Sequence, residues 1–498
     1  MTAETQLPKY LMYIGGEWQA PQSGEWFETS EPFSGKVWAQ IPRGTQADAD
    51  RAVEAAHVAF TSGPWPQFTA TQRAALLRKL AALVEENAEH LGRVEQRDNG
   101  KLITEVKGQV MNIAQWFYYY AGLADKIGGE VIPVNKPGVF NYTKYEPLGV
   151  VVAITPWNSP LSLTAWKMAP ALAAGNTIVI KPSEHASASI LELAKLAEQA
   201  GIPPGVVNVV TGFGNEVGDP LVRHPLTRKV AFTGGEIGGQ RVNEAAASGF
   251  KRVTLELGGK SPNIVFDDAD LDQALKGAIS GIFAAAGQTC MAGSRLLLQD
   301  SIHDEFVEKL VKLVSEARIG DPSLPETQVG PIATRPQWER VMSLIEAAKS
   351  EGARCALGGH ALQGEGYGQG QFVAPTIFTD VTNDMRIARE EVFGPVLSVI
   401  RFTDEDDALR IANDTEYGLA AAVWTQDLRR AMKCVDKLQA GTVWVNNYRT
   451  TSFTSPFGGY KRSGMGREGG VEAIKEYMQV KSVWITPSPK RDNPFVLG

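Results

Sequence analysis

The spacing of apolar residues divides the first 150 residues into helices and short strands. A β-hairpin is predicted at 13–18. Apolar residues at helical spacing, with acids in the first turn, predict a helix over 47–60, and two longer helical segments follow at 69–97 and 102–125. Residues 128–150 change to β-like runs around a Pro-Gly turn, which predicts a projecting hairpin and a candidate contact between subunits.

Strands and helices alternate from residue 149 to 256. The predicted strands are 150–154, 176–180, 206–210 and 229–232, and the predicted helices are 163–174 and 186–200. This rhythm with short connections predicts a parallel, doubly wound sheet.

A second α/β region is predicted from residue 258. Its helices are expected at 271–286, 302–318 and 335–352, and its strands at 294–298, 396–400 and 442–446. The tail forms one more strand at 477–485, which is expected to pair with the 128–150 hairpin or with another subunit.

Composition narrows the functional classes. The chain has 498 residues, a net charge of -7 and no basic tract, which gives nucleic-acid binding no electrostatic support. The first eleven residues are polar and no apolar run reaches the roughly 18 residues of a membrane span, so we expect neither a signal peptide nor a membrane protein. Three cysteines without a pairing pattern predict a reducing cytoplasm, and the six histidines suggest no metal site.

Four turns at the predicted carboxyl ends of the parallel strands form a candidate nucleotide site. They span 155–160, 181–184, 211–218 and 232–239. Ligands of open α/β sheets bind at this edge, where glycine allows close approach and helix N-termini favour phosphate. None of these turns has the G-x-G-x-x-G pattern, and each alone is also explained as a tight turn. Lys181 followed by Glu184 suggests recognition of a ribose, with NAD favoured over NADP.

Three residues are candidates for chemistry, and each has a simpler structural explanation. Cys290 ends a run of small residues that leaves room for a ligand over the sulfur, which suits a nucleophile, although for an isolated cysteine a buried structural role is the commoner explanation. Glu256 lies between two leucines and suits a general base, or a salt bridge to Lys260. Asn158, on a proline-flanked turn, suits an oxyanion donor or an ordinary turn residue.

Seven motifs in order resemble one family. They are Pro-Trp-Asn at 156–158, Lys-Pro-Ser-Glu at 181–184, Phe-Thr-Gly at 232–234, Glu-Leu-Gly-Gly-Lys at 256–260, Gly-Gln-x-Cys at 287–290, Glu-Val-Phe-Gly-Pro at 391–395 and Pro-Phe-Gly-Gly-Tyr-Lys at 456–461. Together they resemble the NAD(P)-dependent aldehyde dehydrogenase superfamily of the hydrolytic, non-acylating type, over nearly the whole chain.

The resemblance implies a mechanism. Cys290 would be the nucleophile that forms a thiohemiacetal and then a thioester, with Asn158 as the oxyanion donor and Glu256 as the base that activates water. Lys167 and Glu468 match a pair that relays protons from the base. Two alternatives remain: a CoA-acylating enzyme, against which Glu256 argues, and a non-catalytic binding or structural member of the fold.

The resemblance also implies a cofactor site for NAD, with NADP as the alternative. The residues it would comprise are Ile154, Thr155, Pro156, Trp157, Lys181, Ser183, Glu184, Gly214, Gly218, Phe232, Thr233, Gly234, Gly235, Leu257, Glu391 and Phe393. Gly235 departs from the pattern because many relatives have serine there, so we expect a modified contact to the pyrophosphate.

The implied substrate pocket has a polar character. Its residues would be Ser159, Leu163, Trp166, Thr289, Met291, Arg449, Thr451 and Phe457. Ser159 is small where relatives acting on aliphatic aldehydes commonly have an aromatic residue. With Arg449 near the mouth, this suggests a polar aldehyde or a semialdehyde, although a solvent-facing arginine is the alternative.

The implied architecture is an α/β aldehyde dehydrogenase-like fold. It comprises a doubly wound Rossmann-type NAD-binding domain, a second α/β catalytic domain and a small β oligomerisation arm that makes dimers or tetramers. The domain ranges are 1–127 with 148–256 for the cofactor domain, 257–475 for the catalytic domain, and 128–147 with 476–498 for the arm.

Overall fold

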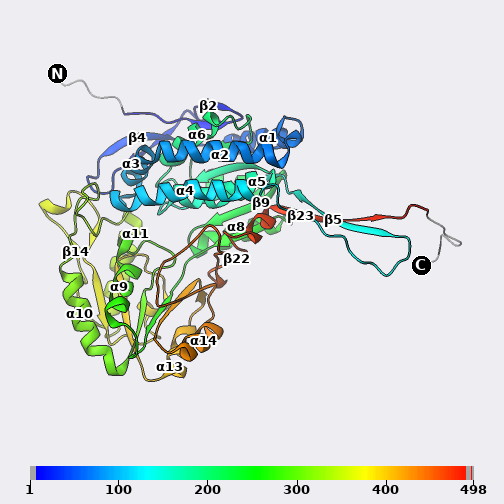
Figure 1. The fold of residues 1–498 in the computed structure, drawn as a ribbon. Coiled ribbons are helices and arrows are strands. Elements are labelled where there is room, and N and C mark those ends of the chain that lie inside the picture. Colours follow the sequence, from blue (N-terminus) through cyan, green and yellow to red (C-terminus); the bar gives the residue numbers. More distant parts are fainter. Residues whose placement is uncertain (1–6, 489–494, 496–498) are drawn as a thin grey trace, which may run out of the picture.

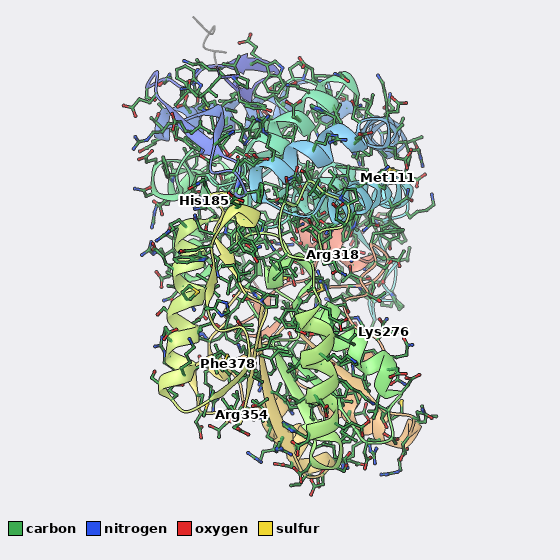
Figure 2. All side chains as sticks on the ribbon, turned by 90° about the vertical axis from the view of Figure 1, so that its left-hand side faces the viewer. Met111, His185, Lys276, Arg318, Arg354 and Phe378 are labelled. Carbon is green, nitrogen blue, oxygen red and sulfur yellow. The ribbon has the colours of Figure 1, made fainter. Side chains whose placement is uncertain are left out.

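The computed structural model describes residues 7–488 and residue 495. The predicted ranges 1–127 and 476–498 also include residues 1–6, 489–494 and 496–498, which lie outside the described residues. Two lobes, each built on one sheet, are stacked on each other, and a thin two-stranded arm projects from them (Figure 1). Figure 2 shows Met111 and His185 on the first lobe and Lys276 and Arg354 on the second.

The first lobe contains an eight-stranded sheet with the strand order β2-β1-β8-β7-β6-β9-β10-β22. Its five central strands are parallel, whereas β1, β2 and β22 pair antiparallel at the two edges. The strands are β1 (Met12–Ile14), β2 (Glu17–Gln19), β6 (Val150–Thr155), β7 (Thr177–Pro182), β8 (Val207–Val209), β9 (Thr227–Thr233), β10 (Arg252–Glu256) and β22 (Gly464–Met465).

Helices cover both faces of this sheet, because its central strands are apolar on both sides. Val151 and Ile178 pack with α2, α4, α5 and α6, while Val150 and Val152 pack against α1 on the other face. The doubly wound prediction is therefore confirmed. The helices are α1 (Gln46–Thr61), α2 (Ala70–Glu86), α3 (Ala88–Asn99), α4 (Ile103–Leu123), α5 (Pro160–Ala174), α6 (Ala188–Gln199), α7 (Asp219–Arg223) and α8 (Glu236–Ala247).

The second lobe contains a seven-stranded sheet with the order β13-β16-β17-β12-β11-β19-β20, parallel except for β13. The strands are β11 (Pro262–Val265), β12 (Arg295–Gln299), β13 (Arg354–Leu357), β16 (Thr376–Thr379), β17 (Val396–Phe402), β19 (Ala420–Trp424) and β20 (Thr442–Val445). Its helices are α9 (Leu271–Ile282), α10 (His303–Ser315), α11 (Arg335–Ser350), α12 (Arg386–Arg389), α13 (Glu405–Asn413) and α14 (Leu428–Lys437). The predicted second α/β region is confirmed.

The arm is a ribbon of β5 (Phe140–Pro147) and β23 (Met478–Ile485), which pair antiparallel along their whole length. The predicted pairing of the tail with this region is therefore confirmed. Another ribbon joins β3 (Trp26–Ser30) to β4 (Val37–Pro42), and shorter pairs join β14 (Ala361–Leu362) to β15 (Phe372–Val373) and β18 (Tyr417–Gly418) to β21 (Tyr460–Lys461).

Three predicted elements are wrong in detail. The helix at 69–97 is divided at Asn87, whose side-chain amide donates to the Leu83 carbonyl, so that α2 ends and α3 begins there. Residues 129–134 make only one bridge, between Val131 and Tyr142, because Pro133 has no N–H for a ladder. The helix at 271–286 ends at Ile282, since a left-handed turn follows it.

The packing of α9 on the second sheet gives a test of the fold. A Cβ at Gly277 would lie 2.1 Å from the ring of the buried Trp424, so Gly277→Ala overpacks this contact and should destabilise the protein by about 1–3 kcal/mol. Gly108→Ala is the matched control, because this α4 glycine has open space and alanine favours a helix. Thermal unfolding should show a lower midpoint for Gly277→Ala alone; equal midpoints for the two variants would contradict the packing described.

Candidate active site

Cys290 follows a short left-handed turn between α9 and β12. Ala285 and Ala286 have φ angles of 52° and 51°, which are unusual for residues with a side chain. Gly287 has φ 72°, and a Cβ there would lie 2.0 Å from the Gly394 carbonyl oxygen. Close approach of the backbone thus requires glycine at this position.

The surroundings of the Cys290 thiol favour its protonated form. Burial, then the charges of Glu391 and Glu256, raise the pKa of Cys290 to about 12, while the backbone N–H groups of Met291 and Cys290 partly oppose the shift. Cys290 is partly exposed, whereas Cys434 is buried, and all three cysteines are free thiols. Its reactivity therefore depends on a base or a charge change nearby.

Asn158 lies beside the nucleophile's loop. Its side-chain amide donates to the Gln288 carbonyl oxygen at 2.9 Å, two residues before Cys290. Since an amide carries two N–H groups, the other remains for an oxyanion. The contact links a loop of the first lobe directly to the segment that carries the sulfur.

Glu256 ends β10 and is buried at 3% exposure. Neither of its carboxylate oxygens has a hydrogen-bond partner among the described residues. Burial, reinforced by the charge of Glu468 and opposed by Lys167, raises its pKa well above the usual range. The alternative of a salt bridge to Lys260 is not realised, because the Lys260 amine is itself buried without a hydrogen-bond partner in the described part of the chain.

The predicted relay pair forms an ion pair behind Glu256. Lys167 Nζ donates to Glu468 Oε1 at 2.5 Å and to Thr233 Oγ1 at 2.6 Å. Lys167 is fully buried and Glu468 is 2% exposed. Their charges act on Glu256 in opposite directions, so the pair adjusts the basicity of the candidate base.

The predicted cofactor residues gather at the carboxyl ends of parallel strands. Ile154 and Thr155 end β6, and Phe232 and Thr233 end β9. Ile154, Phe232 and Leu257 share one apolar cluster. Pro156 and Trp157 begin the loop after β6, half-buried, and Gly234 follows β9 with its Cα against the Phe232 ring.

Polar and glycine residues surround this edge. Lys181 Nζ pairs with Glu184 Oε2 at 3.0 Å, and the Ser183 hydroxyl accepts from the His185 N–H at 3.3 Å. A Cβ at Gly214, Gly218 or Gly235 would meet no atom within 4 Å, and Gly235 is the N-cap of α8. This open space at a helix N-terminus suits a phosphate.

Two predicted cofactor residues come from the second lobe. Glu391 accepts from the Gly259 N–H at 3.1 Å, and burial raises its pKa to about 7. Phe393, with φ 54°, contacts Trp157 edge to face at 5.4 Å between ring centroids. The two halves of the predicted cofactor site are thus in contact across the lobes.

The predicted pocket residues are only partly brought together. Trp166 stacks on Trp116 and meets the buried Phe457 edge to face at 5.5 Å. The hydroxyl of Thr289 is buried without a hydrogen-bond partner among the described residues, and the Met291 carbonyl accepts from Tyr448. Leu163 is half-buried on α5, and its N–H donates to the Ser159 carbonyl at 3.0 Å, whereas Thr451 is exposed on its loop.

The side chain of Arg449 is held by a hydrogen bond and is not free in solvent. It is half-buried with φ 65°, and its guanidinium donates to the Ser280 carbonyl at 2.9 Å. Its charge reaches Lys101, whose pKa is lowered mainly by burial and further by Arg449, with Glu95 and Glu105 opposing.

Sequence reasoning missed a polar connection between α3 and α4. Asn99 and Lys101 are buried there, and Lys101 Nζ donates to the Ser159 hydroxyl and to Gln109 Oε1, both at 2.6 Å. Glu95, 1% exposed, accepts from the Leu161 N–H at the start of α5. An Asn-Gly pair after a helix is an ordinary helix stop, so the sequence carried no signal of this role.

Among residues 7–488 and 495, no helix is long and apolar enough to cross a membrane. The same residues contain no group of three His, Cys, Asp or Glu side chains that could hold a metal ion.

Comparisons with known proteins agree with this geometry. The model of the aldehyde dehydrogenase family matches residues 18–483. An aldehyde dehydrogenase of Emericella nidulans is 46% identical over 97% of each chain. The (Z)-2-((N-methylformamido)methylene)-5-hydroxybutyrolactone dehydrogenase of Acinetobacter baylyi is 44% identical over 99% of this chain and 100% of the relative.

Solved structures give the same result. An NAD+ complex of aldehyde dehydrogenase from Bacillus cereus has a TM-score of 0.94 and 45% identity, covering 96% of this chain and 97% of that one. The predicted fold class and the predicted enzyme class, which oxidises aldehydes to carboxylic acids, are thereby confirmed. This chain belongs to the aldehyde dehydrogenase family.

Proposed function

We propose that Cys290 carries out the aldehyde oxidation and that NAD+ is the cofactor. The observation that supports this most directly is the proximity of two groups. Gly259, three residues after Glu256, lies so close to the Cys290 backbone that a Cβ on it would be 2.8 Å from the Cys290 carbonyl oxygen, and the charge of Glu256 acts on the Cys290 thiol. In this proposal the cofactor domain spans 1–127 and 148–256, the catalytic domain 257–475, and the arm 128–147 and 476–498.

The first half of the reaction forms the covalent intermediate. Glu256 accepts the thiol proton, and the Cys290 thiolate attacks the aldehyde carbon, so that a C–S bond forms and the carbonyl electrons move to oxygen. The free N–H of the Asn158 amide and the Cys290 backbone N–H stabilise this oxyanion, and one such donor typically contributes about 3–4 kcal/mol. The thiohemiacetal then loses its hydride and becomes a thioester on Cys290.

The second half releases the acid. Once the thiol proton from the first half has passed from Glu256 to the pair of Lys167 and Glu468, Glu256 takes a proton from water. The water oxygen attacks the thioester carbon, and the C–S bond breaks to release the acid and the Cys290 thiolate. Both carboxylate oxygens are free for this step among the described residues. The ion pair of Lys167 and Glu468 then moves the proton away from the base.

The cofactor fits the residues present. When bound, NAD+ supplies the acceptor for the hydride. Gly235 and the N-terminus of α8 would hold the pyrophosphate, since the space over Gly235 is open. Burial alone would raise the pKa of Glu184, but the Lys181 charge lowers it, so Glu184 is an ionised acceptor for a ribose hydroxyl and repels a 2′-phosphate. Glu391 and Phe393 would hold the nicotinamide half.

The substrate in this proposal is an aldehyde with a polar or anionic end. Ser159 presents a hydroxyl whose oxygen already accepts from Lys101, which leaves its proton to donate into the pocket. Arg449 adds a second cation close enough to act on Lys101. The Acinetobacter relative, named for a hydroxybutyrolactone, supports an oxygen-rich substrate.

The arm supports assembly into a homodimer or homotetramer. It leaves Phe140, Val480, Trp484 and Ile485 between 44% and 57% exposed on a ribbon with open edges. Three free thiols are in keeping with a reducing cytoplasm as the location.

The covalent mechanism predicts different failures for its two central residues. Cys290→Ala should give no NADH with any aldehyde. Glu256→Gln should release no more than about one NADH per active site, slowly because the acceptor of the thiol proton is missing, and then stall as the thioester. Stopped-flow absorbance and mass analysis of the acylated protein measure both. Cys355→Ala is the control, because this thiol is exposed and far from the lobe interface. Acyl transfer to added coenzyme A without acid formation would instead favour the acylating alternative.

The pH dependence of deacylation should follow the charges around Glu256. The base acts when deprotonated, so the rate rises with pH through its raised pKa. Lys167→Met removes a charge that lowers this pKa and should move the inflection to higher pH; Glu468→Gln removes one that raises it and should move the inflection to lower pH. A loss of rate in both variants with no shift in either would mean that the pair acts on the proton and not on the base.

Arg449 should favour anionic aldehydes. We expect Arg449→Ala to lower the ratio of kcat/KM for succinic semialdehyde to that for butanal about 10-fold, the value of one charged hydrogen bond. Arg354→Ala, at the far end of the second lobe, is the control (Figure 2). An unchanged ratio in Arg449→Ala would rule out anion recognition by this residue.

A further inference from the structure

The connection between α3 and α4 contacts both loops that carry the candidate catalytic groups. The Asn99 amide donates to the carbonyl oxygens of Trp157 at 3.2 Å and Asn158 at 3.4 Å. Six residues later, Glu105 Oε1 accepts from the Ala285 N–H at 2.9 Å. One short segment of the first lobe therefore holds the loop of Asn158 and also the turn that leads to Cys290.

The turn that Glu105 holds is strained. Ala285 and Ala286 both have left-handed backbone angles, which are unfavourable for residues other than glycine. Such a conformation persists only where its surroundings determine it. Within the second lobe, Gln288 helps, because its amide donates to the Ala285 carbonyl at 3.3 Å and accepts from the Ala333 N–H at 2.9 Å. Glu105 is the contact from the other lobe.

We infer that Glu105 is a positioning residue for the nucleophile. By accepting the Ala285 N–H, its carboxylate fixes the left-handed turn and so the direction of Cys290 relative to Asn158. The connection is itself anchored to the second lobe, since the Ile103 N–H donates to the Pro322 carbonyl at 2.9 Å. The inference rests on the proposed role of Cys290 and adds a residue that neither the motifs nor the proposed chemistry includes.

The hydrogen bond, and not the charge alone, is what this role requires. Glu105→Gln keeps a carbonyl oxygen in the same place, whereas Glu105→Ala removes the acceptor and leaves a strained turn with a free N–H. Since misplacement by about 1 Å costs up to ~100-fold in rate, we expect Glu105→Ala to lower kcat ~10- to 100-fold with little change in KM for NAD+, and Glu105→Gln to stay within about 3-fold of the wild type.

The decisive measurement is the rate at which iodoacetamide alkylates Cys290, followed by peptide mass mapping across pH. It should fall with kcat in Glu105→Ala and recover in Glu105→Gln. Glu89→Ala, an exposed acid on α3 paired with Arg93, is the control and should match the wild type. Because alkylation needs no aldehyde, a wild type inactive with every aldehyde would refute the proposed function while this rate still tests Glu105.

Two results would overturn the inference. One is a wild-type alkylation rate and kcat in Glu105→Ala; the other is an equal loss in Glu105→Gln and Glu105→Ala, which would assign the effect to charge. If Glu105→Ala does not fold, Glu105→Asp replaces it, because it keeps the charge but is one methylene shorter. Glu105→Asp should show the same loss, and wild-type alkylation in that variant would also overturn the inference.

Discussion

The site is arranged around one constraint, the buried carboxyl group of Glu256. This group has no hydrogen-bond partner among the described residues. Desolvation of Glu256 makes its ionised form costly, and no neighbouring donor offsets that cost directly. Lys167 is near enough to lower the pKa of Glu256, but it donates its hydrogen bonds to Glu468 and Thr233. The carboxylate is therefore kept basic, accessible to a proton and unable to relax into a salt bridge.

The second requirement is that the two lobes contact each other at the edges that carry the candidate site residues. The contacts between the lobes are of different kinds: an amide on a carbonyl between Asn158 and Gln288, and an aromatic pair between Trp157 and Phe393. The strand β22, which lies beyond residue 257, also pairs with β10 and places Gly464 beside Glu256. Because the chain crosses between the lobes repeatedly, a displacement of one lobe would disturb Glu256, Cys290 and Asn158 together.

Much of this was predictable from local pattern. The parallel strands from 150 to 256 are apolar on both faces, and that pattern is enough to predict a sheet covered by helices on both sides. Glu256 stood out because a carboxylate between two leucines conflicts with its surroundings, and such conflicts mark functional sites. The left-handed turn at Ala285 and Ala286 was not predictable, since alanine is a strong helix former and only tertiary contacts hold it in that conformation. The same is true of the contacts that Asn99, Lys101 and Glu105 make with Trp157, Ser159 and Ala285, which lie 58 to 180 residues away in the chain.

The residues around Lys101 explain why the polar side of the proposed pocket does not destabilise the fold. A lysine buried at Lys101 would be expensive alone, but Glu95 lies 3.6 Å from its amine, and Gln109 and Ser159 accept its hydrogen bonds. The cation is thus satisfied by protein groups before a substrate arrives. Lys101 orients the Ser159 hydroxyl: its amine donates to the Ser159 oxygen, so the hydroxyl proton is left to donate into the proposed pocket. In the proposed pocket, a small hydroxyl held in this way would favour an oxygen acceptor on the substrate, where an aromatic side chain at the same position would favour an alkyl chain.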